Sequence, residues 1–235
     1  MRFGLSNVLV LAGLTQAFTY ERLNKSDAAL VILDMQEGLF SLARDYDATL
    51  FRDAMYAHAE LGKLFNLPVV LSTSSEQGPN GPLPNEFLNM YPNATPVKRQ
   101  GEVDAWDNPD FRAAIEATGK SQIIIAGIVT DVCTTFAALS LREAGYAVWA
   151  NHEASGTTTV VHREEANERM RSAGVQVVSY FAIVCELMRD WRSVPGAAEV
   201  FPVLDKYFPA YGMVARAHRA AIQNGTILDG ESDLP

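Results

Sequence analysis

The chain has 235 residues, of which 48% are hydrophobic and 20% are charged, and these proportions are typical of a folded globular protein. Its formal net charge is −9, so the chain lacks the basic surface needed to bind nucleic acid or an anionic membrane. It contains only two cysteines, Cys133 and Cys185, which excludes a scaffold held together by several disulfide bonds.

The N-terminal segment differs from the rest of the chain. One arginine precedes a short apolar run, and small residues suited to cleavage follow it, up to Ala17. The run is too short to span a bilayer, so residues 1–17 are predicted to be a secretory signal peptide. A cytoplasmic protein is the alternative, because a free thiol is at risk in an oxidising compartment. Three sequons are compatible with secretion, at Asn24, Asn93 and Asn224.

The remaining chain alternates between short apolar runs and longer segments with helical spacing. This alternation predicts a three-layer α/β/α sandwich with a mainly parallel, Rossmann-like sheet. We expect one domain over residues 27–192 and a tail over 193–235 that packs on the domain or on a neighbouring subunit. The predicted strands are Ala28–Leu33, Pro68–Ser72, Ser121–Ala126, Ala147–Ala150 and Val175–Ser179. The predicted helices are Ala48–Phe65, Asn108–Ala117, Cys133–Glu143, Val161–Ala173 and Phe181–Asp190.

The first predicted strand ends in an acidic residue. Residues 28–33 are all apolar, and Asp34 follows them directly. The carboxyl ends of strands in an open parallel sheet face the crevice that binds ligands. Asp34 is therefore a candidate site residue, and the other interpretation is a helix N-cap.

Two adjacent cations follow a long connection. Residues 74–96 are rich in Gly, Pro and Asn, and a connection of this length is often functional. Lys98 and Arg99 come next. Neighbouring side chains of an extended segment point to opposite sides, so only one of the two cations can face a site. The alternative is that both are solvated surface charges.

The most informative segment is QIIIAGIVTDVC, which ends at Cys133. Its Ile-rich part predicts a buried strand, and the spacing of apolar residues up to Gly145 predicts a helix directly after it. Backbone N–H groups and the positive end of the helix dipole at this junction lower the pKa of a thiol. Cys133 is thus a candidate nucleophile, although a lone cysteine is more often a small buried hydrophobe. Cys185 lies on an apolar helical face and is interpreted as core packing.

Together, the three segments resemble the isochorismatase-like cysteine hydrolases, over about residues 27 to 192. GIVTDVC is similar to that family's G-[IV]-x-T-[DE]-x-C turn, and LDMQ lies upstream of it. The resemblance implies the fold given above and a catalytic triad of Asp34, a cation and Cys133. The chain is most similar to the YcaC-like branch, whose spacing to the aromatic segment AWDN favours Arg99 as the cation. The wider family has a lysine in this role, which keeps Lys98 open.

The resemblance also implies a reaction. Cys133 attacks a small amide or related carbonyl compound and forms a thioester, which water releases with Asp34 as the base. The backbone N–H groups of Val129 and Cys133 receive the oxyanion, and the peptide bond between Ile128 and Val129 is cis. The resemblance to the YcaC-like branch implies a ring-like homo-oligomer, and an octamer is one such assembly. The alternative function is a non-catalytic oligomeric scaffold or binding protein of the same fold.

No metal ion or other cofactor is expected. The nicotinamidase branch of the family carries an Asp-x-His metal pair after its second strand, and the matching stretch here is LSTSSE, at residues 71–76. The four histidines are scattered without ligand spacing. No glycine-rich phosphate loop is present in the sequence either. The expected partners are a small-molecule substrate and further copies of the chain.

Overall fold

The computed structural model describes residues 20–226, so the predicted signal peptide lies outside the described residues and stays a prediction. Six strands form one sheet, and all neighbouring strands pair in parallel. The strands are β1 (Ala28–Leu33), β2 (Val69–Ser74), β3 (Val97–Arg99), β4 (Gln122–Gly127), β5 (Ala147–Asn151) and β6 (Gln176–Val178). Their order across the sheet is β3-β2-β1-β4-β5-β6.

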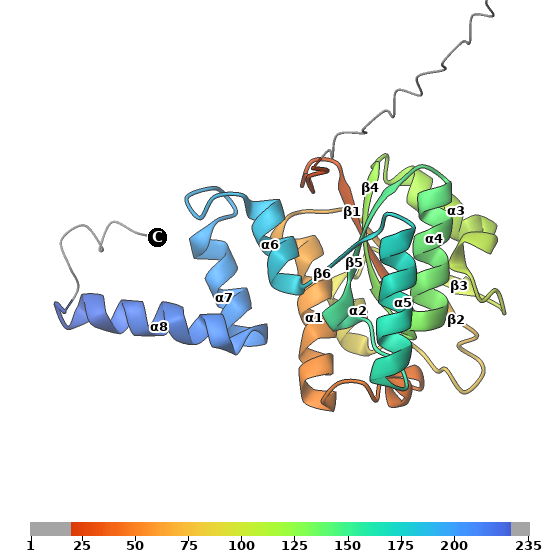
Figure 1. Ribbon diagram of the computed structural model, residues 1–235, viewed down its shortest axis with the longest axis horizontal. Coiled ribbons are helices and arrows are strands. Elements are labelled where there is room, and N and C mark those ends of the chain that lie inside the picture. The colour runs from red at the N-terminus through yellow and green to blue at the C-terminus, as the bar shows by residue number, and fades with distance from the viewer. Residues whose placement is uncertain (1–19, 227–235) are drawn as a thin grey trace, which may run out of the picture.

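Helices cover both faces of this sheet (Figure 1). One face carries α1 (Ala48–Leu64), α2 (Asn85–Met90), α6 (Tyr180–Met188) and α7 (Ala197–Tyr207). The other face carries α3 (Pro109–Ala117), α4 (Thr135–Glu143) and α5 (Val160–Ser172). A last helix, α8 (Pro209–Gln223), follows α7. The predicted α/β/α sandwich with a parallel, Rossmann-like sheet is therefore confirmed.

The apolar runs of the sequence are the buried strands. Every residue of β1 is fully buried, because both faces of the sheet are covered. Leu30 and Ile32 pack into the core cluster on one face, whereas Val31 and Leu33 pack into the cluster on the other face. As predicted, the strand ends at Leu33, because the polar residue Asp34 interrupts the apolar run.

Three helices and one strand were not predicted. The strand β3 has three residues and the helix α2 has six, too few for a periodic pattern to stand out. The helices α7 and α8 begin beside prolines and glycines that indicate loops in a sequence. In α7 the pattern is further masked because Pro202 lies inside the helix.

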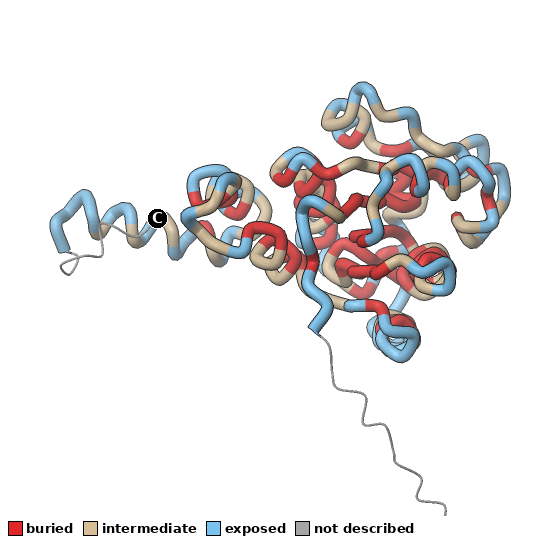
Figure 2. The backbone as a smooth tube through the Cα atoms, turned by 90° about the horizontal axis from the view of Figure 1, so that it is seen from above, coloured by how far each residue is buried: buried red, intermediate tan, exposed pale blue. Residues whose placement is uncertain are grey.

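The two helices of the C-terminal tail differ in their burial. In α7, Val200 and Leu204 are buried in the core cluster that includes α1, so this helix packs on its own domain. In α8 the only buried residue is Gly212, which lies against Asp205 of α7. The helix projects from the body of the molecule and is mostly exposed or half-buried (Figure 2). Among residues 20–226, no helix is both long and apolar enough to cross a bilayer.

Candidate active site

The candidate site lies where the order of the strands changes direction. After β1 the chain adds β2 and β3 on one side, and it then returns to the other side of β1 to add β4. A crevice opens at such a point, at the carboxyl ends of the two central strands. Leu33 pairs with Gly127, so the ends of β1 and β4 lie side by side. Asp34 and the turn that carries Cys133 leave the sheet at this edge.

Asp34 forms a buried ion pair with Arg99. A guanidinium nitrogen of Arg99 donates to Asp34 Oδ2, and neither side chain has any exposed area. Arg99 Nε also donates to Ser72 Oγ at 3.1 Å, and Nη1 donates to the carbonyl of Glu102. These acceptors offset the cost of burying the charge. Arg99, the last residue of β3, is thus held against the carboxylate of Asp34, which follows β1.

Lys98 lies outside this cluster. Its side chain is 59% exposed and pairs with Glu76 Oε2 at 2.7 Å. Because side chains alternate along β3, the residue next to buried Arg99 faces solvent. The position of Lys98 contradicts a role for it in the site, and Arg99 is the one cation of the pair that meets Asp34.

Burial has the largest effect on the pKa of Cys133. It raises the pKa of the thiol to about 12, and the charge of Asp34 and a hydrogen bond to that carboxyl act in the same direction. A hydrogen bond from the backbone of Val129 and the charge of Arg99 lower the pKa by less. Burial therefore opposes the lowering of the thiol pKa that the sequence analysis expects from a helix N-terminus. Cys133 lies within a π-helical turn, Thr130–Thr134, and α4 begins directly after this turn, at Thr135.

The carboxyl of Asp34 is placed to exchange a proton with this thiol. Burial raises the pKa of Asp34, while Arg99 and the neighbouring thiol of Cys133 oppose the rise. Asp34 Oδ1 has no hydrogen bond of good geometry within the described residues. The backbone of Asp34 has a φ of 53°, in the left-handed region, which costs a residue other than glycine about 1–2 kcal/mol. Such strain persists where surrounding contacts enforce it, and here it aims the carboxyl into the site.

The turn after β4 has the features of an oxyanion site. The peptide bond between Ile128 and Val129 is cis, as the family resemblance implies. The backbone of Val129 lies close enough to the Cys133 thiol to lower its pKa, so this donor is placed near a group attached to the sulfur. Preorganised N–H donors at such a place stabilise negative charge as it develops.

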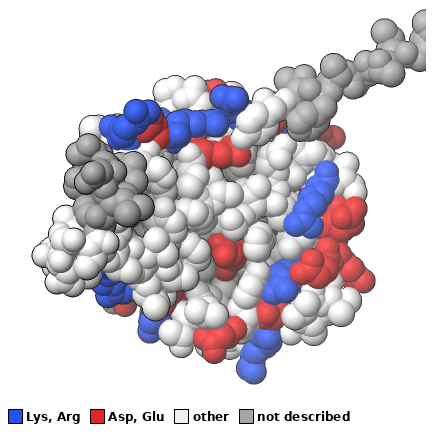
Figure 3. All heavy atoms as spheres, turned by 60° about the vertical axis from the view of Figure 1, so that its left-hand side comes forward, with Lys and Arg blue, Asp and Glu red and all other residues white. Residues whose placement is uncertain are grey.

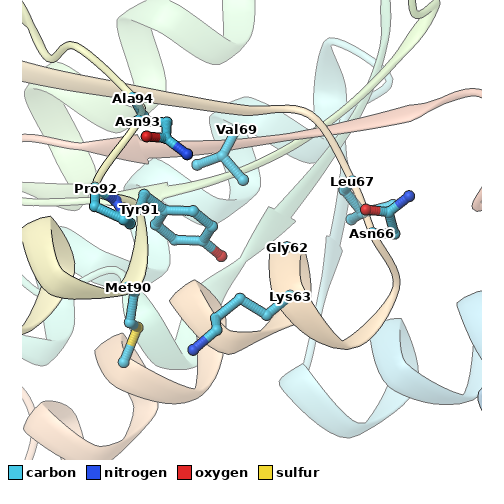
Figure 4. A pocket seen from close by; sticks show the side chains of 10 residues that line it. All are labelled: Gly62, Lys63, Asn66, Leu67, Val69, Met90, Tyr91, Pro92, Asn93 and Ala94. Carbon is cyan, nitrogen blue, oxygen red and sulfur yellow. The ribbon is translucent and has the colours of Figure 1, made fainter.

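Two cavities of the described residues lie near the ends of the sheet, and neither is lined by Asp34, Arg99 or Cys133. One of about 290 Å³ starts at Met35, next to Asp34, and is lined by Gln36, Phe40 and Tyr56 among others. A wider one, of about 470 Å³, lies between α1, α2 and the start of β2, so it opens at the opposite edge of the sheet (Figure 4). Its Tyr91 hydroxyl donates to the carbonyl of Ala59. We assign no chemistry to the wider cavity, because acid, cation and thiol all lie elsewhere.

No group of three or more His, Cys, Asp or Glu side chains within residues 20–226 could hold a metal ion. His58 is a core histidine: its Nε2 lies 3.0 Å from the carbonyl oxygen of Val31, and burial lowers its pKa to about 4. Its other ring nitrogen lies 3.3 Å from Asn151 Nδ2. Both nitrogens therefore have partners within the fold.

The sequence analysis missed the residues that hold Arg99. Ser72 of β2 is fully buried, and its hydroxyl accepts the hydrogen bond from Arg99 Nε. The signal that could have revealed it is a row of hydroxyl residues, Ser72 to Ser74, at the end of an apolar strand. Polar side chains at that position face the same crevice as Asp34.

Comparisons with known proteins agree with this geometry. Residues 28–180 match the isochorismatase domain. The chain is 46% identical over 183 residues to the "Probable hydrolase YcaC" of Escherichia coli, and the match covers 77% of this chain and 88% of that protein. A structure of YcaC from Pseudomonas aeruginosa with hexane-2,5-diol and covalent acrylamide has a TM-score of 0.82 at 45% identity, covering 86% of this chain and 98% of that one. The E. coli structure, described as an octameric hydrolase of unknown specificity, has a TM-score of 0.83 at 43% identity and the same coverage.

Proposed function

The chain belongs to the isochorismatase family, and from that membership we propose that it is a cysteine hydrolase that cleaves a small amide or related carbonyl compound. The observation that carries the proposal is the convergence of Asp34, Arg99 and Cys133 at the carboxyl ends of adjacent strands. An acid with a raised pKa beside a thiol is the arrangement that nucleophilic catalysis needs.

The proposed reaction starts with proton transfer. Asp34 takes the proton of Cys133 as the sulfur attacks the carbonyl carbon, so the thiolate exists only when the substrate is in place. The new C–S bond leaves a tetrahedral oxyanion, which the N–H groups of Val129 and Cys133 receive. Asp34 then returns the proton to the leaving amine as the C–N bond breaks, and a thioester remains.

Water completes the cycle. Asp34 takes a proton from the water that attacks the thioester, the C–S bond breaks, and the proton returns to the sulfur. Arg99 keeps its charge throughout, because a guanidinium is not deprotonated in proteins. Its role in the proposal is to hold the carboxyl in place and to stabilise its ionised form. Apart from the thiol of Cys133, Asp34 is then the only group of the three that accepts and donates protons.

Mass spectrometry of the intact protein with a panel of small amides tests this function. We expect at least one amide to add its acyl group to Cys133 and to release its amine with turnover. Cys133→Ala is the matched control and should gain no mass. A complete absence of adducts and of amine release over the whole panel would favour the alternative, a non-catalytic binding protein.

We also propose that the chain assembles into a ring-like homo-oligomer through α8. The E. coli relative is described as octameric, and the structural match to it covers 98% of that chain. The end of the molecule that carries the C-terminal helices has a broad uncharged surface with charged side chains mainly at its edge (Figure 3). On α8, Met213 and Val214 are 64% and 59% exposed, more apolar surface than a solvated helix needs.

Deleting residues 209–235 should reduce the molecular mass measured by light scattering to that of a smaller assembly. This deletion removes α8 but leaves Val200 and Leu204 of α7 in the core, so the domain should still fold. A deletion of residues 227–235 alone is the matched control and should keep the full mass. If the intact chain is already a monomer at micromolar concentration, this assembly does not exist.

A further inference from the structure

The loop after β5 is attached to the turn that carries the proposed oxyanion donor. Gly156 pairs with Ile128 in an isolated parallel bridge, and its carbonyl accepts from the N–H of Thr130 at 3.0 Å. Ser155 Oγ accepts from the N–H of Gly127 at 3.3 Å. These contacts lie on both sides of the cis peptide bond, so the loop fixes the backbone before and after it.

Thr157 extends this attachment with its side chain. Its Oγ1 donates to Asp131 Oδ1 at 2.5 Å, two residues before Cys133. Its own N–H donates to Asp45 Oδ1 at 2.8 Å. Hydrogen bonds to a carboxylate are about twice as strong as those between neutral groups. Thr157, which is 1% exposed, therefore links the oxyanion turn to the segment before α1 through two carboxylates.

The segment before α1 is itself held in place. Arg163 of α5 donates to the carbonyl of Asp45 at 3.0 Å and lies 3.5 Å from its Oδ2. The same guanidinium lies over the ring of Tyr46, 4.4 Å from its centre. The backbone of Gly156 packs closely on this segment, because a Cβ added to Gly156 would come within 2.6 Å of Ala43 Cβ. Thr157 is thus anchored through Asp45 to Arg163 of α5.

We propose that Thr157 is a positioning residue that holds the Val129 N–H in the orientation needed to receive the oxyanion, acting through Asp131. The inference rests on the proposed function and adds to it a residue outside the triad. A donor lowers the barrier only if it is oriented before the charge develops. A misplacement of about 1 Å at a reacting centre costs on the order of 100-fold in rate.

Two reactions of Cys133 separate this role from a general structural one. With p-nitrophenyl acetate, the sulfur bonds to the carbonyl carbon through an oxyanion, the ester C–O bond breaks, p-nitrophenolate leaves, and Asp34 takes the thiol proton. With iodoacetamide, the sulfur displaces iodide from a saturated carbon, and no oxyanion forms. A residue that positions the oxyanion donor should affect the first reaction and not the second.

The variant Thr157→Val keeps the size of the side chain but loses the hydroxyl. We expect its rate constant for acylation by p-nitrophenyl acetate to fall by about tenfold or more, with an unchanged rate and pH profile of alkylation by iodoacetamide. Thr157→Ser should retain the wild-type acylation rate. Thr158→Val is the matched control, since Thr158 is exposed and contacts only His162 through its hydroxyl. Thermal melting reports whether each variant is folded.

Three outcomes would overturn the inference. Equal acylation rates in Thr157→Val and the wild type would show that the hydroxyl does not hold the donor. An equal fall in acylation and alkylation would assign Thr157 to the general fold or to the thiol. If wild-type Cys133 is alkylated but never acylated, the proposed function fails as well, and this result is distinct from the other two.

Discussion

Cys133→Ala is expected to lower amide hydrolysis by about ten-thousand-fold or more, because removal of a nucleophile leaves only binding and the oxyanion donors. Truncating one half-buried sulfur should lower the free energy of unfolding by about 1 kcal/mol, within the usual range of single substitutions. Turnover of an amide found in the panel and thermal melting, measured on the same preparation, check both statements.

Cys185→Ala is the matched control for this prediction. Cys185 is also a free, half-buried cysteine, but it lies in α6 among apolar side chains and has no carboxyl or cation among the groups that shift its pKa. Its loss should leave hydrolysis at the wild-type rate. Wild-type activity in Cys133→Ala, or loss of activity in Cys185→Ala, would remove Cys133 from the mechanism.

Arg99→Ala is expected to reduce both activity and stability. Removing one partner of a buried ion pair leaves the other charge uncompensated and costs about 3–5 kcal/mol of unfolding free energy. Lys98→Ala should cost less than about 1 kcal/mol, because the pair of Lys98 with Glu76 is largely exposed on the lysine side. Denaturant unfolding of the two variants measures this difference.

The two variants should also differ in the pH dependence of thiol alkylation. Arg99 lowers the pKa of both Asp34 and Cys133, so its removal disfavours every ionised form of that pair. In Arg99→Ala, the midpoint of alkylation by iodoacetamide should therefore move to higher pH, while Lys98→Ala should keep the wild-type midpoint. Arg99→Lys keeps a charge but loses the fork that contacts Ser72 and Asp34, so partial restoration is expected. A shift in Lys98→Ala alone would return the role to Lys98.

Local patterns in the sequence were sufficient for five of the six strands and for Asp34 and Cys133 as candidate site residues. The apolar run of residues 28–33 is long, continuous and followed by Asp34, and the strand and its end lie where the pattern places them. The same holds for β4 and the turn before Cys133. Periodicity reports these features reliably because burial on both faces of a parallel sheet requires uninterrupted apolar residues.

Contacts between distant segments were beyond the reach of these patterns. The choice between Lys98 and Arg99 depends on which of the two side chains of a three-residue strand is buried. The pairing of β3 with β2 decides this. The position of α7 on the domain, with α8 projecting from it, likewise depends on packing that prolines and glycines hide.

The sequence by itself determined five of the six strands, the helices α1, α3, α4, α5 and α6, and the position of Asp34 and Cys133 after two central strands. The tertiary structure alone decided that Arg99 meets Asp34, that burial raises the pKa of the Cys133 thiol, and that Thr157 is attached to Asp131. The reason is physical: hydrophobic periodicity is a property of neighbouring residues. The ion pair of Arg99 with Asp34 joins residues 65 positions apart, and the hydrogen bonds of Thr157 join it to Asp131, 26 positions away, and to Asp45, 112 positions away.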